Sequence, residues 1–523
     1  MKIEIYDMTL REGAQTAGVI FTDYEKLKII SELDRLGVDC IETGFFGADS
    51  ADALAGLCKK ASDCRAALSV LCQTRRPGKK ASEDTVLTEL AESGFGVCAV
   101  VGKASVSQVE QILGTTPEEN IEMIADTLRF LRSKGKRTVF DAEHFFDGYA
   151  ENPEYARRVV RAAAEAGADT VVLCDTNGGM LPDVIGYTVE GIKKEFPDVK
   201  FGIHCHNDTG MADACSVASV IAGVQHVQCT VMGLGERCGN ASLSTTVPVL
   251  QEKLGFSCIP KECMSLMSET VRDVCQIANI GFDEDAPFVG GHAFMHKAGL
   301  HIDAVKKFPA SFEHIVPETV GNSRSYIVSE LSGRAAITEM LEGTVCGITK
   351  DSPETARVIE ALKNAEASGC QYDSSGASLK LLTGYALGKF KKPFEILDYK
   401  LLFSADADPS SRWSAIVKIY DGETEQLRVG EGDGPVNALD IAAHLALRHR
   451  FPCIGNVRMI DIKARIDKND VNASASTVRV FVEYGDGEST WRTMGASTDI
   501  IAASWQALVD AYEYIILSEE NLI

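Results

Sequence analysis

The chain lacks the cysteine pattern of a disulfide-built protein. Its 523 residues include 16 cysteines, but these are scattered singly and none forms a C-x-x-C pair. Cys40, Cys72, Cys98 and Cys174 lie inside apolar runs, which is typical of small buried hydrophobic residues in a reducing compartment. We therefore expect free thiols and a cytoplasmic location.

Long hydrophobic runs and an excess of basic residues are also missing. No apolar run reaches the roughly 18 residues that a membrane-spanning helix requires. Residues 1–5 pass directly into a strand pattern, without the form of a signal peptide. The net charge is −23, whereas a nucleic-acid-binding surface needs a basic stripe. These absences predict a protein that binds neither membrane nor nucleic acid, although a few local Arg or Lys side chains can attract an anionic small molecule.

What is present is an alternation of short apolar runs with amphipathic stretches. The runs cover residues 3–6, 40–46, 67–73, 97–102, 138–145, 170–174, 201–206 and 226–232. Helix starts stand between them, such as the capping box of Thr22 with Glu25. Near-continuous apolar strands suit a parallel sheet covered on both faces, and eight strand–helix units in about 250 residues predict an α/β fold of the (β/α)8 TIM-barrel type. A doubly wound open sheet is the alternative.

The length implies more than one domain, because a single core stops growing at about 250–300 residues. After residue 254 the pattern becomes helical with loops, including helices expected at 335–341 and 352–367. From residue 399 it changes to strands at 415–420, 457–465, 477–484 and 489–494, with helices at 435–448 and 499–517. We predict a barrel domain over residues 1–275, linker subdomains over 276–395 and an α+β domain over 396–523.

Polar side chains cluster where five of the predicted strands end. They are Arg11 and Glu12; Glu143 and His144; Asp175, Thr176 and Asn177; His204 and His206; and Glu236, Arg237 and Asn240. Catalytic groups of a TIM barrel lie at these carboxyl ends, so the clusters predict one site. His204 and His206 share a face of their strand, with Cα atoms roughly 7 Å apart. Together with a carboxylate from elsewhere, the two imidazoles can hold a divalent cation. Alone, such an H-x-H pair is more often structural.

Three motifs carry a resemblance to a known family. Residues 10–15 read LREGAQ, residues 204–208 read HCHND, and residues 233–240 read GLGERCGN. Together they resemble the acetyl-CoA-dependent 2-isopropylmalate, homocitrate and citramalate synthases, of the wider superfamily of metal-dependent lyases and synthases. Residues 140–149 (FDAEHFFDGY) and 294–303 (FMHKAGLHID) are most similar to one branch of the citramalate synthases.

The resemblance implies a divalent metal ion (Mg, Mn or Zn) in the barrel. Glu12, His204 and His206 are the implied ligands, with Asn240 as an outer or weak ligand. The family often has Asp where this chain has Glu12. Because the Glu side chain is one methylene longer than that of Asp, either the backbone at Glu12 lies farther from the metal or the carboxylate binds the metal in a different mode.

The resemblance also implies roles in joining the methyl group of acetyl-CoA to the carbonyl of a 2-keto acid. Arg11 would donate to the ketone oxygen as negative charge develops there. Thr176 would hold the keto-acid carboxylate, and Glu143 would line the substrate site and assist proton transfer. Asp7 and Gln15 would orient Arg11 and the ligands. The plainer interpretation of Arg11 is a structural ion pair with a neighbouring carboxylate.

Three further features bear on the implied site. His301 matches the catalytic histidine that a linker domain contributes in this family, and the ordinary pKa of histidine suits acid–base work. Phe312 stands where relatives often have Tyr, so any hydroxyl role there is lost or passes to Tyr326 or a water. Residues 75–80 (RRPGKK) follow the third strand and can attract CoA phosphates, although a solvated loop explains them equally well.

The α+β domain resembles the C-terminal regulatory domain of isopropylmalate and citramalate synthases. In that family it dimerises and binds a branched-chain amino acid as feedback inhibitor, so we expect a homodimer with an amino-acid effector.

The prediction is an acyltransferase of isoleucine biosynthesis that condenses acetyl-CoA, its co-substrate, with pyruvate to give citramalate and CoA. Isopropylmalate or homocitrate synthesis differs only in the keto-acid pocket, which the sequence does not reveal. More distant alternatives are a lyase of the superfamily, a non-catalytic amino-acid sensor and a non-haem iron oxygenase, which also uses two His and one carboxylate.

Overall fold

The computed structural model describes residues 1–296, 299–326, 352–370, 372, 375–405, 408, 412–466, 476–487, 489–520 and 522. The chain divides into two compact units: residues 1–294 with 314–324, the barrel unit, and residues 295–313 with 325–523, the C-terminal unit. The helix expected at residues 335–341 lies outside the described residues.

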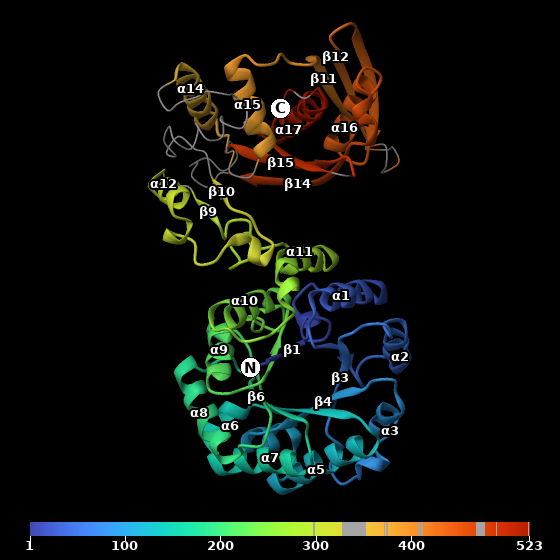
Figure 1. Cartoon of the computed structure of the whole chain (residues 1–523). Coiled ribbons are helices and arrows are strands. Elements are labelled where there is room, and N and C mark those ends of the chain that lie inside the picture. Colours follow the sequence, from blue (N-terminus) through green and yellow to red (C-terminus); the bar gives the residue numbers. More distant parts are fainter. Residues whose placement is uncertain are drawn as a thin grey trace. The chain divides into compact units, whose positions relative to one another are not determined.

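Eight parallel strands close into a barrel in the barrel unit (Figure 1). They are β1 (Glu4–Asp7), β2 (Cys40–Phe45), β3 (Ala67–Gln73), β4 (Val97–Lys103), β5 (Arg137–Glu143), β6 (Thr170–Asp175), β7 (Phe201–Cys205) and β8 (His226–Cys229). Neighbours in the chain are neighbours in the ring, and β1 closes it by pairing with β8, Glu4 opposite His226. The TIM-barrel prediction is confirmed, and the open doubly wound sheet is wrong.

Two strands, β5 and β8, end two and three residues earlier than the apolar runs predicted. β5 ends at Glu143 and β8 at Cys229. The backbone turns left-handed soon after each end, at His144 (φ 58°) and Met232 (φ 55°), and a strand cannot continue through that conformation. The early end of β5 places Glu143 at the carboxyl rim of the barrel.

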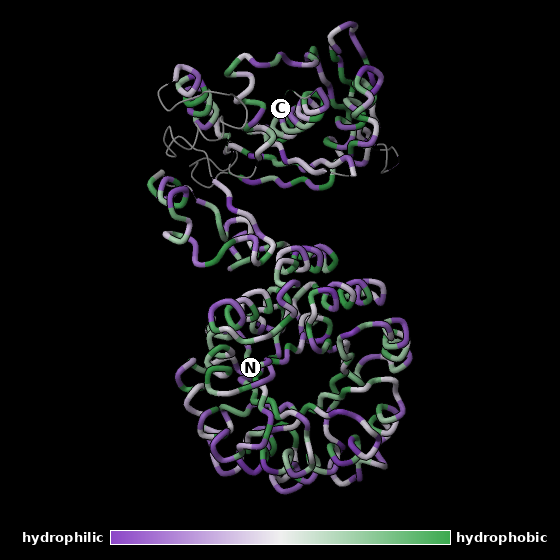
Figure 2. The backbone as a smooth tube through the Cα atoms, viewed as in Figure 1, coloured by the Kyte–Doolittle hydropathy of each residue, from purple (hydrophilic) through white to green (hydrophobic). Residues whose placement is uncertain are grey.

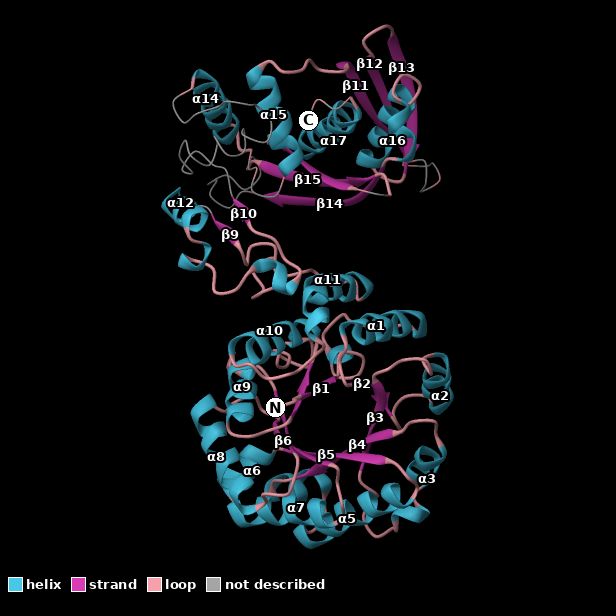
Figure 3. Cartoon of the chain, viewed as in Figure 1, coloured by secondary structure: helices cyan, strands magenta, loops and turns pink. Residues whose placement is uncertain are grey.

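Helices surround the strands (Figure 3). They are α1 (Asp23–Leu36), α2 (Ala51–Lys60), α3 (Thr85–Glu92), α4 (Val106–Gln108), α5 (Pro117–Ser133), α6 (Phe145–Glu151), α7 (Pro153–Glu165), α8 (Pro182–Glu195), α9 (Ala212–Ile221) and α10 (Leu243–Pro248). A further helix, α11 (Met267–Ile277), packs on α1 and α10 outside this ring (Figure 3). The predicted capping box of α1 is present: Glu25 N donates to Thr22 Oγ1, and Thr22 N donates to the Glu25 carboxylate. Hydrophobic and hydrophilic segments alternate along these helices (Figure 2), because each helix turns one face to the strands.

A buried carboxylate organises the amino-terminal end of the barrel. Glu4 pairs with Arg137, Lys200 and His226, the last with 3.1 Å between Glu4 Oε2 and His226 Nδ1. Burial alone would raise the pKa of Glu4, but His226, Arg137 and Lys200 lower it below the ordinary value of 4.5. A carboxyl group with a lowered pKa stabilises the fold above its unfolded-state value, and the contribution is lost as the pH falls below it.

We expect Glu4→Gln to lower the free energy of unfolding at pH 7 by about 2 kcal/mol. Fully buried pairs cost roughly 3–5 kcal/mol to break, but Arg137 and Lys200 are 35% and 36% exposed and stay hydrated. Urea unfolding followed by far-UV circular dichroism measures the loss, and the difference from wild type should shrink as the pH falls below 4.5. Glu269→Gln, at a 58% exposed residue paired with Arg35, is the control and should change the free energy by less than about 1 kcal/mol. An equal loss at both positions would contradict the role of Glu4.

Among its described residues, the C-terminal unit contains two antiparallel sheets of three strands and a short parallel pair. The sheets are β11 (Glu395–Phe403), β12 (Trp413–Tyr420) and β13 (Glu425–Gly432), and β14 (Arg458–Ile466), β15 (Val478–Gly485) and β16 (Thr490–Ser497); the pair is β9 (Met295–His296) and β10 (Ser325–Tyr326). Its helices are α12 (Gly299–Lys307), α14 (Pro353–Ala367), α15 (Gly376–Leu387), α16 (Pro435–Leu447) and α17 (Ile500–Glu519). α16 packs on β12 and β13, and α17 on β15 and β16. The four strands and two helices expected after residue 399 are confirmed, whereas β11 and β13 were not predicted.

The helix α17 is long and apolar enough to cross a membrane by length and composition alone. However, 61% of its apolar window is buried, and Trp505, Leu508 and Tyr512 contribute to the core of the C-terminal unit. These contacts are those of a core helix.

Candidate active site

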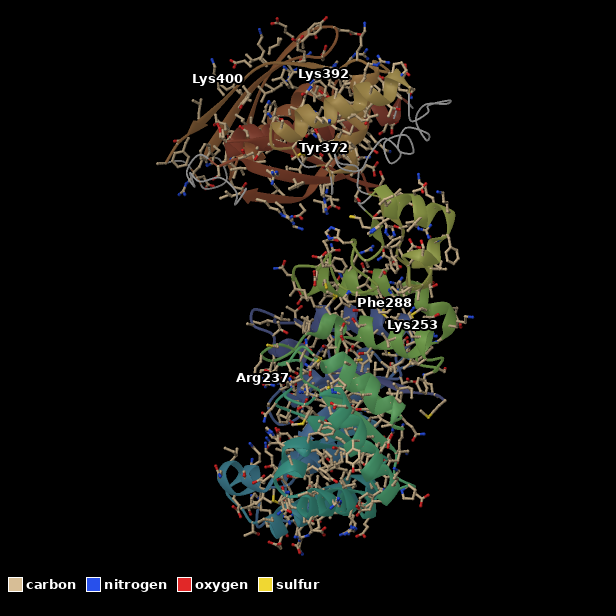
Figure 4. The ribbon with its side chains drawn as sticks, turned by 90° about the vertical axis from the view of Figure 1, so that its left-hand side faces the viewer. Arg237, Lys253, Phe288, Tyr372, Lys392 and Lys400 are labelled. Atoms are coloured by element: carbon tan, nitrogen blue, oxygen red, sulfur yellow. The ribbon has the colours of Figure 1, made fainter. Side chains whose placement is uncertain are left out.

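A cavity of about 410 Å³ opens at the carboxyl ends of the barrel strands. It brings together most of the residues singled out from the sequence: Arg11, Glu12, Gln15, Glu143, Thr176, His204 and His206. Arg237, which is exposed at this cavity and labelled in Figure 4, also lines it. The predicted convergence of strand ends on one site is present.

The predicted metal ligands are neighbours. The ring centroids of His204 and His206 are 5.0 Å apart, and His206 Nε2 lies 3.8 Å from Glu12 Oε1. Asn240 forms an isolated backbone bridge with His206, and its Nδ2 donates to the backbone oxygen of Leu234 over 3.0 Å. Three polar atoms of these residues are buried without a hydrogen-bond partner: Glu12 Oε1, His206 Nδ1 and Asn240 Oδ1.

These residues fit a divalent cation. No three His, Cys, Asp or Glu side chains among the described residues stand at the spacing of a complete metal centre. Yet leaving the buried Glu12 and Asn240 oxygens without partners costs about 1–3 kcal/mol each, and a bound cation would satisfy both. Gly235 leaves room for this arrangement, because a Cβ there would lie 2.0 Å from Asn240 Nδ2 and 3.5 Å from Glu12 Cγ.

The electrostatics of the donors suit metal binding. Burial lowers the pKa of His204 to about 3, and burial also lowers that of His206. Burial would raise the pKa of Glu12, but Arg11 and the two histidines lower it. Near neutral pH the site therefore holds two neutral imidazoles and one carboxylate, the protonation states that a divalent cation binds.

Arg11 lies between two buried carboxylates. Its Nη1 donates to Glu12 and its Nε donates to Glu42 on β2. Glu42 is fully buried, and its second oxygen accepts from Tyr6 Oη at 2.8 Å. Arg11 thus forms the structural ion pairs of the plainer interpretation and also lines the cavity.

Glu143 and Thr176 belong to the wall of the cavity formed by the ends of β5 and β6. Glu143 pairs with Lys103 at the end of β4, and both line the cavity. Thr176 Oγ1 accepts the backbone N–H of His144 at 2.8 Å, so its own hydroxyl proton is available to donate. Arg237 braces this wall, donating to the backbone oxygen of Thr176 at 2.7 Å and to Asp208 at 2.8 Å.

Other predicted residues lie elsewhere or make other bonds. Asp7 accepts from Thr9 N at 2.9 Å and from Thr9 Oγ1 at 3.0 Å, and these hydrogen bonds support the turn after β1 rather than Arg11. Gln15 is exposed and lines the cavity. His301 belongs to the C-terminal unit, where its exposed ring stacks on Phe312 with centroids 4.2 Å apart.

The basic segment of residues 75–80 divides into two parts. Arg75 is buried, with Nη1 2.8 Å from Glu119 and Nε 3.0 Å from Asp126. The charge of Arg75 is therefore paired with these two carboxylates and stabilises the fold. Arg76 is exposed and lines the cavity together with Pro77.

Several polar residues of the site were missed from the sequence, among them Glu42, Lys103, Asp141 and Gln228. Glu42, Asp141 and Gln228 are buried inside strands, and burial together with Glu42 raises the pKa of Asp141 to about 7. A charged or amide residue within an otherwise apolar barrel strand was the available signal, because such a side chain needs a polar partner inside the barrel.

Three family models match successive parts of the chain. The HMGL-like model matches residues 2–278, which include the whole cavity. The homocitrate synthase post-HMGL domain-like model matches residues 288–369, and the LeuA allosteric (dimerisation) domain model matches residues 374–516.

Curated relatives match the chain almost from end to end. It is 40% identical to the (R)-citramalate synthase of Aquifex aeolicus, over 99% of both chains. It is 41% identical to the (R)-citramalate synthase of Streptomyces coelicolor, over 98% of this chain and 96% of the relative. Identity to a probable 2-isopropylmalate synthase of Methanosarcina mazei is 30%, over 99% of this chain and 96% of the relative.

Proposed function

Because the chain belongs to the citramalate synthase family, we propose that it converts acetyl-CoA, pyruvate and water to citramalate and CoA. The observation that carries the proposal is the meeting of Glu12, His204, His206 and Arg11 in one cavity. Condensation needs a polarised ketone and a cation for the developing alkoxide, and these four residues supply the groups for both.

Glu12, His204 and His206 are the proposed ligands of a divalent metal ion, Mg, Mn or Zn, with Asn240 as an outer ligand. The bound ion supplies Lewis acidity for the keto-acid carbonyl. Glu12 Oε2 is held by Arg11, which leaves Oε1 as the oxygen for ligation. The longer side chain of Glu relative to Asp is accommodated beside Gly235.

The remaining groups act on the substrates. Arg11 directs its guanidinium to the ketone oxygen as that oxygen gains charge, and Thr176 donates its hydroxyl to the keto-acid carboxylate. Removing a proton from the acetyl methyl group creates the carbon nucleophile, which attacks the ketone carbon and forms an alkoxide. The alkoxide takes up a proton, and water then cleaves the thioester and releases CoA. Glu143, ion-paired with Lys103, assists the proton transfer, and His301 is the proposed base from the C-terminal unit.

The C-terminal residues are proposed to dimerise the enzyme and to bind an amino-acid effector. The match to the LeuA allosteric (dimerisation) domain supports this assignment. The proposed effector is a branched-chain amino acid, and the proposed setting is isoleucine biosynthesis in the cytoplasm. The division of the chain into domains at residues 275 and 395, predicted from the sequence, is also a proposal.

Release of free CoA tests the function directly. The full chain is incubated with acetyl-CoA and, separately, pyruvate, 2-ketoisovalerate and 2-ketoglutarate, with and without a chelator. We expect release with pyruvate, its loss with chelator and its recovery on adding a divalent cation. Preference for 2-ketoisovalerate would instead support isopropylmalate synthesis, the activity named for the Methanosarcina mazei relative. Repeating the assay with isoleucine and leucine tests the effector.

We expect Arg76→Ala to raise KM for acetyl-CoA about three- to fivefold without changing kcat. An exposed charge contact is worth up to about 1 kcal/mol and is screened by salt, so the effect should weaken at high ionic strength. Initial rates at varied acetyl-CoA measure it. Arg158→Ala, at a half-buried arginine on α7 paired with Glu118, is the matched control and should leave KM unchanged. An unchanged KM for Arg76→Ala would assign residues 76–80 to a solvated loop.

A further inference from the structure

Gln228 connects a proposed metal ligand to a residue on the far side of the barrel. It is fully buried on β8. Its Oε1 lies 2.8 Å from His204 Nδ1 on the adjacent strand β7. Its Nε2 donates to Asp141 Oδ1 at 2.9 Å on β5, which is not a neighbour of β8 in the ring. The amide therefore spans the barrel interior beneath the cavity.

The two ends of the amide have opposite hydrogen-bonding abilities. An amide oxygen only accepts, so His204 Nδ1 must carry the proton in its bond with Gln228 Oε1. The other ring nitrogen, Nε2, then keeps its lone pair. This is the tautomer that a histidine uses when it binds a metal through Nε2.

Asp141 determines which way the amide points. If the amide were reversed, its oxygen would face Asp141 Oδ1, another acceptor, and its NH₂ group would face His204 Nδ1. That arrangement would place the proton of neutral His204 on Nε2 and remove the lone pair. The ionised Asp141 carboxylate can only accept, and it accepts the Gln228 N–H at 2.9 Å, so ionised Asp141 favours the observed orientation.

We propose that Gln228 is a positioning residue that, held by Asp141, fixes the Nδ1–H tautomer of His204 and presents Nε2 for metal binding. The inference rests on the proposed metal role of His204. No step of the reaction passes through Gln228, which touches neither substrate nor metal. Partners that orient a metal-binding histidine typically contribute 10–100-fold to metal affinity.

The test measures metal affinity of the metal-free full-length protein by titration calorimetry with Mn²⁺ or Zn²⁺. Gln228→Met keeps the shape of the side chain but removes the acceptor, and should weaken binding about 10- to 100-fold. The double variant Gln228→Glu/Asp141→Asn keeps the net charge, an acceptor for His204 Nδ1 and an N–H donor between positions 141 and 228; it should retain affinity within about threefold. Gln225→Met, the same change three residues earlier in the chain, is the matched control and should bind as wild type.

The outcomes separate this inference from the proposed function. If His206→Ala abolishes metal binding but Gln228→Met binds as wild type, the positioning role is wrong and the metal site stands. If neither change affects metal binding, the metal site itself is wrong. If Gln228→Met does not fold, ¹⁵N spectra of histidine-labelled, metal-free wild-type protein decide, with His204→Gln assigning the signal. Protonated Nδ1 supports the proposal, and protonated Nε2 overturns it.

Discussion

His206→Ala is expected to lower kcat/KM for pyruvate and acetyl-CoA by about 10³-fold or more. The imidazole faces Glu12 Oε1 at 3.8 Å, and its loss leaves the proposed site with one imidazole and one carboxylate. Metal polarisation of a carbonyl is worth several kcal/mol of transition-state stabilisation, and about 4 kcal/mol corresponds to roughly a thousandfold in rate. The rate of CoA release over a range of pyruvate concentrations measures the loss.

The measurement needs a histidine control and a metal readout. His292 is 43% exposed and bonds to Asp285 at 2.8 Å, so His292→Ala should keep the wild-type rate. Metal content after gel filtration should fall in His206→Ala and not in His292→Ala. A variant at His206 that retains full activity with chelator present would refute the metal-dependent mechanism. Loss of activity with unchanged metal content would restrict His206 to a role other than ligation.

The barrel and the position of its site were predictable because their signals are local. Each apolar run specifies a strand, and the carboxyl ends of parallel strands meet at one rim. His204 and His206 could therefore be assigned to one face from spacing alone. Their closeness to Glu12, which lies 192 residues away from His204 in the chain, followed from the same rule once β1 and β7 were assigned to a closed ring.

The missed residues are those whose role depends on contacts across the ring. Gln228 bonds to Asp141 on a strand that is not its neighbour, and strand spacing does not reveal which interior side chains meet. In the sequence, Glu42 is a single charged residue in an apolar run, and its ion pair with Arg11 becomes visible only in the structure. The strands β11 and β13 were missed for another reason: they are largely exposed, with Leu402 and Leu427 56% and 58% exposed. They therefore lack the buried pattern that marks a core strand.

Arg11→Ala is expected to lower kcat about 10²- to 10³-fold, the typical effect of removing one donor to a developing oxyanion. It should also destabilise the barrel. Glu42 is completely buried, and its Oε1 would lose the Arg11 partner while Oε2 keeps Tyr6. Removing one member of a buried ion pair lowers the free energy of unfolding by roughly 3–5 kcal/mol. The single variant Arg11→Ala therefore does not distinguish a catalytic role of Arg11 from a structural one.

The double variant Arg11→Ala/Glu42→Gln separates these two roles. Gln at position 42 carries no charge and still accepts from Tyr6, so we expect most of the lost stability to return while kcat stays low. Far-UV circular dichroism follows unfolding of the whole chain. Trp413, Trp491 and Trp505, which all belong to the C-terminal unit, provide a fluorescence control that a barrel defect should leave nearly unchanged. If restoring stability also restored kcat, Arg11 would be a structural ion-pair residue, and the cation for the alkoxide would have to come from another side chain of the cavity, such as Lys103.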